Sequence, residues 1–351
     1  MENGSRQERQ LNMDLLRILA CFSVIMLHSA SQFWYELPLL SGGWLVANSY
    51  DAAFRFGVPI FVMLSGRFFL SAEGEVDIKA LYRKNILRLF VIYWVWSAVY
   101  GLWDCRDWMG AEGVVWKDYL TEIFLGRYHL WYLPMQIGLY MLLPVLNSWL
   151  AHCTKKNLEY FLLLFILLQI GLSTVKILRI PGPVLQALQQ VNVELVCSYV
   201  GYFVLGYYLY RYPPQKKARL GLYAGGAAGL FGAVGISVLE TKLKGQAMAT
   251  AFDSYSLFTF LLVVALYVGF QNLQQSSYRT GRWLIKEISA DTLGIYLMHV
   301  LLMEFLDGYG IHSMTVNSIV GIPLLALACF VICGLAAALL RRIPLVGKYI
   351  C

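Results

Sequence analysis

The chain has 351 residues, of which 59% are hydrophobic, 15% are aromatic and only 14% are charged. Ordinary soluble domains carry about 25% charged residues, and a disordered chain has far less apolar surface, so the composition excludes both classes. A hydrocarbon core needs about 20 apolar residues per helix, which gives this length room for roughly ten membrane spans. The net charge of +7 is expected of a membrane protein with basic loops on one face, and it predicts no nucleic-acid partner.

Ten apolar runs follow one another along the chain. They cover about residues 14–31, 52–71, 86–103, 130–150, 158–177, 193–210, 219–239, 255–271, 289–306 and 316–340. The hydrophilic stretches between them are only loops, and a short tail, residues 1–13, precedes the first run. The pattern therefore predicts an all-α, polytopic bundle of about ten transmembrane helices, with residues 1–351 forming a single integral-membrane domain.

The distribution of basic residues predicts the orientation of this bundle. If the N-terminus is cytoplasmic, 20 of the 28 Lys and Arg residues fall on the cytoplasmic side and eight, Arg55 among them, fall on the outer side. This asymmetry indicates ten spans in a cell membrane, with both termini in the cytoplasm. A secretory signal peptide is an alternative interpretation of the first run, but Arg17 lies inside the apolar stretch and no separate basic region precedes it.

Small residues concentrate in the seventh run, where Gly221, Gly225 and Gly229 recur every four residues and are followed by Gly232 and Gly235. Such residues let helix backbones approach closely, so we expect a packing surface, with a broken, ligand-lining helix as the alternative. The seven cysteines are scattered, with no disulfide framework and no zinc-ligand spacing.

Ionisable residues within the first run are the strongest indication of a functional site. Arg17 and His28 are eleven residues apart, which is about three helical turns and about 16.5 Å of rise, so both side chains lie on one face. A guanidinium suits the binding of phosphate and an imidazole suits proton transfer near neutral pH. Asp14, one turn before Arg17, can pair with it. The alternatives are a membrane anchor for Arg17 and a packing role for His28.

The second run and the loop after it add polar and basic candidates. Gly57 and Pro59 interrupt the second run, which predicts either a helix that lines a cavity or a simple kink. Its polar end carries Ser65 and Arg67, and the basic residues Arg83, Lys84 and Arg88 lead into the third run. These cations are on the side from which a cytosolic phosphate compound would enter.

Two further stretches bring aromatic and imidazole groups toward the outer half. The fourth run opens Tyr128-His129-Leu130-Trp131-Tyr132, which also fits an aromatic belt. Tyr296 and His299 are three residues apart in the ninth run, so they share a face and can enter the same cavity as His28. No pair of histidines on one helix has metal-ligand spacing, so we expect no metal.

Together these stretches resemble the integral-membrane acyltransferase type 3 family. The resemblance rests on Arg17 with His28, on Val58-Pro59-Ile60-Phe61-Val62-Met63-Leu64-Ser65-Gly66, on the basic cluster that ends at Arg88, on His129-Leu130-Trp131-Tyr132-Leu133 with Pro144, and on Gly294-Ile295-Tyr296-Leu297-Met298-His299. The chain is most similar to the branch that contains the enterobacterial common-antigen O-acetyltransferase and the membrane half of vancomycin-resistance serine racemases. It departs from the usual pattern at Asn85, where many members carry Arg, and at Arg67, where an aromatic usually follows Ser-Gly.

The resemblance implies an enzyme that takes acetyl groups from cytosolic acetyl-CoA and passes them to a hydroxyl group of a cell-surface glycan or lipid-linked saccharide. It implies that His28 is catalytic and that Arg17 assists the donor, whereas Ser65, Arg88, Tyr296 and His299 lie in family motifs.

Several alternatives stay open. The acyl group can be acetyl, succinyl or another short acyl, and His28 can act as general base or carry the acyl group itself. A transporter or flippase of a small polar solute or lipid-linked sugar, using the same helical cavity, is the competing function, although the two halves show no visible repeat.

Overall fold

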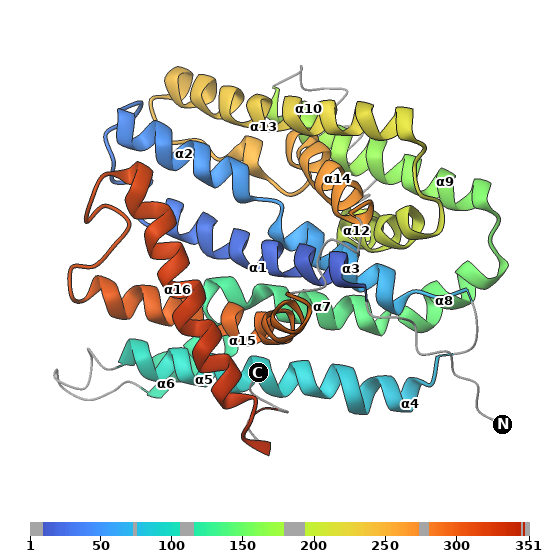
Figure 1. The fold of residues 1–351 in the computed structure, drawn as a ribbon, viewed down its shortest axis with the longest axis horizontal. Helices are drawn as coiled ribbons and strands as arrows, with labels where there is room; N and C mark the ends of the chain where they lie inside the picture. The colour runs from blue at the N-terminus through green and yellow to red at the C-terminus, as the bar shows by residue number, and fades with distance from the viewer. Residues whose placement is uncertain are drawn as a thin grey trace.

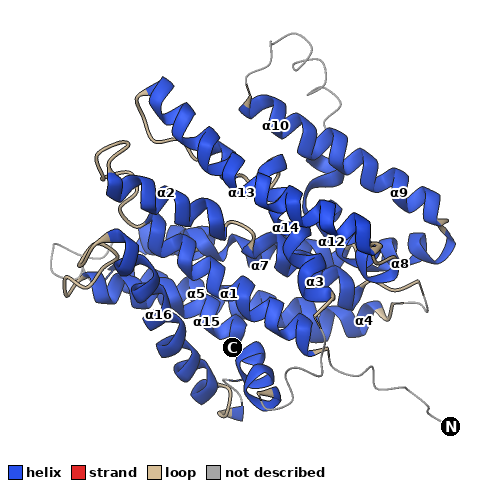
Figure 2. Ribbon diagram, turned by 45° about the horizontal axis from the view of Figure 1, so that its top comes forward, coloured by secondary structure: helices blue, strands red, loops and turns tan. Residues whose placement is uncertain are grey.

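The computed structural model describes residues 10–72, 76–105, 116–178, 194–273, 281–344 and 347. Helices alone build this part of the chain, and no strand occurs in it (Figure 2). In chain order the α-helices are α1 (Leu11–Ser31), α2 (Gly42–Phe54), α3 (Gly57–Phe69), α4 (Ile78–Leu81), α5 (Leu87–Cys105), α6 (Trp116–Leu125), α7 (Tyr132–Met141), α8 (Leu143–His152), α9 (Lys155–Leu164), α10 (Leu172–Ile177), α12 (Glu194–Arg211), α13 (Lys216–Lys244), α14 (Leu257–Gln271), α15 (Arg282–Asp307) and α16 (Ser318–Leu340). The π-helices η1 (Tyr82–Ile86) and η3 (Phe165–Gly171) and the 3-10 helices η2 (Tyr128–Trp131) and η4 (Thr250–Phe252) lie between them. The predicted all-α fold is confirmed.

Eight of the described helices are long and apolar enough to cross a membrane. They cover Leu11–Ser31, Gly42–Phe69, Ile78–Asp104, Lys155–Ile177, Lys216–Lys244, Thr250–Gln271, Arg282–Asp307 and Ser318–Leu340. The bent pair Tyr119–Met141 and Leu143–His152 makes a ninth if it counts as one span. The predicted run 193–210 forms α12, which does not meet the same test. The polytopic bundle is therefore confirmed, and the orientation of its termini stays a prediction.

Helix α1 occupies the centre of the bundle (Figure 1). It packs against α2, α3, α14, α15 and α16, so most of its surface faces protein and not lipid. Polar groups fix it to these neighbours: the Asn12 amide donates to the backbone oxygens of Phe270 and Gln271, and the Ser29 hydroxyl donates to the backbone oxygen of Ile322 at 2.9 Å. The residues of α1 are thus held in a protein interior, which is where an ionisable side chain can serve a reaction.

The second crossing differs from the prediction because it begins at Gly42 and consists of two helices, α2 and α3, with a break at Arg55. Arg55 therefore lies inside the span, not on the outer side, and its guanidinium bonds both carboxylate oxygens of Asp51 at 2.6 and 2.7 Å. Pro59 does not kink a helix, because it lies in the first turn of α3, where a missing N–H removes no helical hydrogen bond.

Close backbone contacts between helices occur where glycine replaces a side chain. A Cβ on Gly66 of α3 would lie 1.8 Å from the backbone oxygen of Phe203 in α12, and one on Gly206 would lie 2.0 Å from the backbone oxygen of Met63. On α13, Gly229 faces the backbone oxygen of Phe258 in α14 in the same way, whereas Gly226 and Gly232 face side chains of α14. The glycine run is thus a packing surface as expected, but Gly221 and Gly235 have nothing within 4 Å and take no part in it.

Candidate active site

A polar cavity of about 290 Å³ opens beside the first turns of α1. Helices α1, α3, α5, α7 and α15 supply its walls. It is lined by Arg17, Phe61, Leu64, Ser65, Phe68, Phe69, Arg88, Tyr132, Tyr140, Ser289, Ala290, Thr292, Leu293 and Tyr296. Two arginines from different helices, Arg17 and Arg88, therefore line one space whose other walls are aromatic, aliphatic and hydroxyl-bearing side chains. We call this space the Arg17 cavity.

The Arg17 side chain is positioned by its neighbours on α1 and α3. Its Nη1 lies 3.7 Å from Oδ1 of Asp14, and its guanidinium carbon lies 5.5 Å from the centre of the Phe68 ring. The buried Asp14 carboxylate also accepts a hydrogen bond of 2.7 Å from the hydroxyl of Ser289 on α15. Asp14 thus links α1 to α15 and orients Arg17. The Arg17 side chain is 32% exposed, so it stays accessible to a ligand.

Three imidazoles from three separate elements meet deeper in the bundle. The ring centres of His28 on α1 and His299 on α15 are 5.2 Å apart, and His129 on η2 lies 6.4 Å from His28 and 5.3 Å from His299. Tyr128 closes one side, with its ring centre 5.4 Å from that of His28. Among the described residues no group of three His, Cys, Asp or Glu side chains has the arrangement of a metal site. Three imidazoles whose ring centres lie within 6.4 Å of one another are suited to proton transfer.

The tautomer of His299 follows from its hydrogen bond. Its Nδ1 lies 2.6 Å from the backbone oxygen of Tyr296, which can only accept, so Nδ1 carries the proton when the ring is neutral. Nε2 is then a hydrogen-bond acceptor, and within the described chain it is buried with no partner. An unpartnered acceptor buried this deeply is costly, which is typical of a group reserved for a ligand or a proton.

Tyr296 joins the Arg17 cavity to the imidazole cluster. Its ring lines the cavity and lies 5.7 Å from the ring of His129 and 5.9 Å from that of His299, measured between centres. Its hydroxyl donates to the backbone oxygen of His129 and so fixes η2 against α15. His28 is not among the cavity-lining residues. Arg17 therefore belongs to the cavity and His28 to the cluster, and Tyr296 contacts both groups of residues.

A salt-bridge network supports the cluster from the far end of α15. Arg127, which precedes η2, bonds Asp104 of α5 at 2.8 Å and also bonds Glu304 of α15. Gly126 next to it adopts a positive φ of 69°, a conformation that glycine takes without cost. The network ties α5, η2 and α15 together, so it holds His129 and His299 in place. Nothing in the sequence signals that Arg127 pairs with residues so distant along the chain.

Not every predicted site residue faces the Arg17 cavity. Arg67 is turned toward the start of the chain, where it bonds Gln10 and lies 4.3 Å from the centre of the Tyr210 ring. Arg83 and Lys84 lie exposed on η1 and are not among the lining residues. Trp131 points instead toward α12, with its ring centre 5.6 Å from that of Tyr199. Asp14 acts on the cavity only through Arg17 and Ser289.

Several lining residues were missed although their spacing carries a signal. Phe61, Leu64 and Phe68 lie three or four residues from Ser65 or from each other, so they share one face of α3. Ser289 and Thr292 similarly precede Tyr296 on one face of α15. A helical projection started from each predicted residue would have found them.

Comparison with known proteins gives one family. A family model described as an acyltransferase domain matches residues 10–340. No curated protein and no solved structure matches the chain.

Proposed function

Since the chain belongs to the acyltransferase domain family, we propose that it is a membrane-bound O-acyltransferase. It transfers an acetyl or other short acyl group from cytosolic acyl-CoA to a hydroxyl of a cell-surface glycan or lipid-linked saccharide. One observation carries this proposal. The ring of Tyr296 lines a cavity with two guanidinium groups and also contacts His129 and His299, the two buried members of the imidazole cluster.

The Arg17 cavity suits the phosphate end of the donor. Arg17 and Arg88 stay charged at all relevant pH values, and their planar forks match phosphate oxygens. The cavity's aromatic walls suit the apolar arm of a coenzyme thioester. In this arrangement the phosphates stay beside Arg17, while the thioester passes the Tyr296 ring to reach His28. The distance along α1 between the two residues, about 16.5 Å, requires such an extended donor.

In the transfer step, His28 acts as general base. Its free ring nitrogen takes the proton of the acceptor hydroxyl while that oxygen attacks the thioester carbonyl. A carbon–oxygen bond forms, the carbon–sulfur bond breaks, and the coenzyme thiolate takes the proton from the imidazolium, which restores neutral His28. Base catalysis of this kind supplies about 10² to 10⁴-fold in rate. The ring of His299 lies 5.2 Å from that of His28, measured between centres, and packing against it limits the orientation of the base.

The test is thiol release from acetyl-CoA by the reconstituted protein, given a mixture of surface-glycan acceptors. We expect His28→Gln to lower acceptor-dependent thiol release by about 10²-fold or more, because the base is lost while the fold is kept. His152→Gln is the matched control, since His152 lies exposed on α8 away from the cavity. A wild-type rate in the His28 variant contradicts the proposal. Solute uptake without any thiol release would identify a transporter instead.

A further inference from the structure

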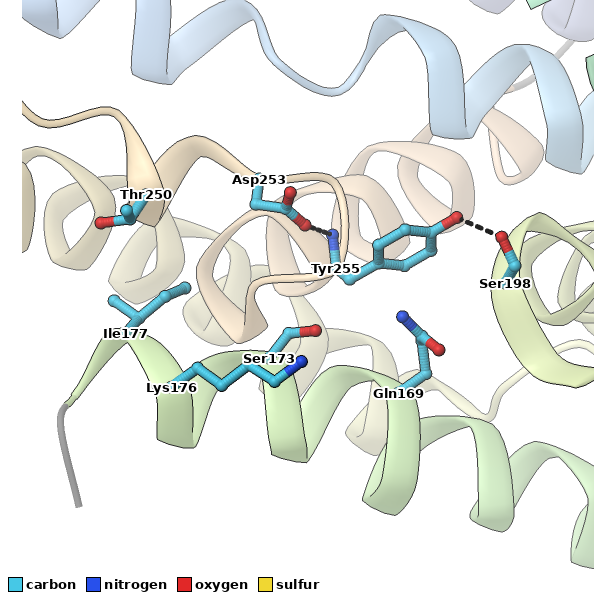
Figure 3. A pocket seen from close by; sticks show the side chains of 8 residues that line it. All are labelled: Gln169, Ser173, Lys176, Ile177, Ser198, Thr250, Asp253 and Tyr255. Carbon is cyan, nitrogen blue, oxygen red and sulfur yellow. Dashed lines mark hydrogen bonds between the residues drawn. The ribbon is translucent and has the colours of Figure 1, made fainter. Parts of the chain in front are cut away.

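A second polar cavity lies on another face of the bundle, where α10, α12 and the loop before α14 meet (Figure 3). Its volume is about 430 Å³, and it is lined by Gln169, Ser173, Lys176, Ile177, Ser198, Thr250, Asp253 and Tyr255. Seven of these eight side chains carry a polar atom. No part of the proposed reaction described above uses them. We call this space the Gln169 cavity.

The Gln169 cavity lies toward the end of the bundle opposite to Arg17. The Asn12 amide bonds the backbone oxygens of Phe270 and Gln271, which places the C-terminal end of α14 beside the first turns of α1. Tyr255 precedes the other end of α14. His28 is likewise displaced from Arg17 toward the C-terminal end of α1. The cavity and the imidazole cluster are therefore on the same side of the Arg17 cavity along the helix axes.

The polar groups of this cavity are built into irregular backbone. Gln169 belongs to the π-helix η3, an arrangement often found at functional sites, and its side chain is only 4% exposed. Its Oε1 has no hydrogen-bond partner within the described chain. Ser198 departs from helical geometry inside α12, and its hydroxyl lies 2.8 Å from that of Tyr255. A buried amide oxygen without a partner, beside open volume, indicates a missing ligand donor.

An aromatic wall connects this cavity to the imidazole cluster. The ring centre of Tyr255 lies 5.2 Å from that of Tyr199, which lies 5.6 Å from that of Trp131. Trp131 ends η2, and His129 of the imidazole cluster is in the same turn. Contact thus continues from the Gln169 cavity to η2 through three rings. A ligand held against Tyr255 lies along a path of aromatic surfaces toward His28.

We infer that the Gln169 cavity is the binding site for the hydroxyl-rich headgroup of the acyl acceptor, an uncharged saccharide. This inference rests on the proposed function. Asp253 and Gln169 offer acceptor oxygens, Lys176 and the serine hydroxyls offer donors, and Tyr255 offers a ring face, which together match sugar hydroxyls and sugar C–H surfaces. One carboxylate and one ammonium cancel in charge, so the lining favours a neutral ligand over an anionic one.

The test measures protection of an introduced thiol and needs no acyl transfer. Ser173→Cys places a thiol in the cavity wall, and its modification by a charged methanethiosulfonate is followed by mass spectrometry in nanodiscs. The probes are methyl α-D-glucopyranoside and methyl N-acetyl-β-D-glucosaminide, with betaine at equal osmolarity as the control solute. We expect one glycoside to slow modification about five-fold when its concentration is four times its Kd, because occupied sites do not react. Tyr309→Cys, at an exposed site outside the cavity, should react unchanged.

Two second-site variants identify the groups involved. In the Ser173→Cys background, a second substitution Gln169→Ala should abolish protection of the thiol by the glycoside. The substitution Tyr255→Phe, which keeps the ring and loses only a hydroxyl, should weaken that protection. The proposed acceptor site is overturned if neither glycoside slows the modification of Ser173→Cys. It is also overturned if a glycoside slows the modification of Tyr309→Cys to the same extent. If His28-dependent thiol release persists in that case, the transferase proposal stands and the acceptor binds elsewhere. If protection is found but thiol release does not depend on His28, the saccharide site stands and the transferase proposal fails.

Discussion

At the scale of single residues, the site depends on Tyr296. Its ring is shared by the Arg17 cavity and the imidazole cluster, and its hydroxyl holds the backbone of His129. In the proposed reaction, the thioester passes this ring on its way from the Arg17 cavity to His28. The ring would then lie between the donor's phosphate end and its reacting end.

Arg17 provides the prediction at this scale. Arg17→Ala should raise the KM for acetyl-CoA by about 10 to 100-fold with little change in kcat, because a hydrogen bond to a charged group contributes about 1.5–3 kcal/mol. Arg17→Lys should recover only part of this, since an ammonium lacks the fork. Steady-state kinetics across acetyl-CoA concentration measure both. Arg83→Ala is the control, because Arg83 lies exposed outside the cavity. An unchanged KM in Arg17→Ala would show that Arg17 is an anchor.

Several residues of the Arg17 cavity and the imidazole cluster could be predicted from the sequence, but the full set of residues in each could not. The spacing of Arg17 and His28 along α1, and that of Tyr296 and His299 along α15, are local properties that a helix converts directly into shared faces. Arg67 could not be excluded in the same way, because its direction is set by Gln10 and Tyr210 from other elements. Contacts between segments that are far apart in the sequence leave no periodic pattern from which they could be predicted.

At the scale of elements, helix α3 depends on close contact with α12. Gly66→Ala adds a methyl group where only 1.8 Å separates the Cβ position from a backbone oxygen, so the helices must move apart. We expect a loss of about 1–3 kcal/mol in the free energy of unfolding, the usual cost of overpacking. Thermal unfolding in detergent measures it. Gly221→Ala, in open space on α13, should keep or slightly raise stability, because alanine favours helix. Equal midpoints for the two variants would contradict this packing.

Element boundaries were predicted least well where two helices share one crossing. The break between α2 and α3 comes before Pro59, and the ion pair of Asp51 with Arg55 stabilises it inside the span. The sequence pattern starts this run at residue 52 and assigns Arg55 to the outer side, because it cannot show that Asp51 and Arg55 neutralise each other. The bend between α7 and α8 was missed for a related reason, since the apolar run continues through it.

At the scale of the whole molecule, the number of crossings decides where the ends lie. Ten crossings would place both termini on one face, and they require that the bent pair and α12 each cross in addition to the eight spans. We expect fluorescent and periplasmic reporter fusions to locate the N-terminus and the C-terminus together on the cytoplasmic side, as the excess of Lys and Arg requires. If the two reporters lie on opposite sides, either α12 or the bent pair does not cross.

The central claim is that a thioester donor extends from the Arg17 cavity past Tyr296 to His28. A density map of the protein with a non-hydrolysable thioether analogue of acetyl-CoA tests this most directly. The account predicts phosphate density beside Arg17 and Arg88, and the sulfur-bearing arm beside the ring of His28. An analogue bound elsewhere, or one whose arm ends on the Arg17 side of Tyr296 with His28 enclosed by protein, would contradict it.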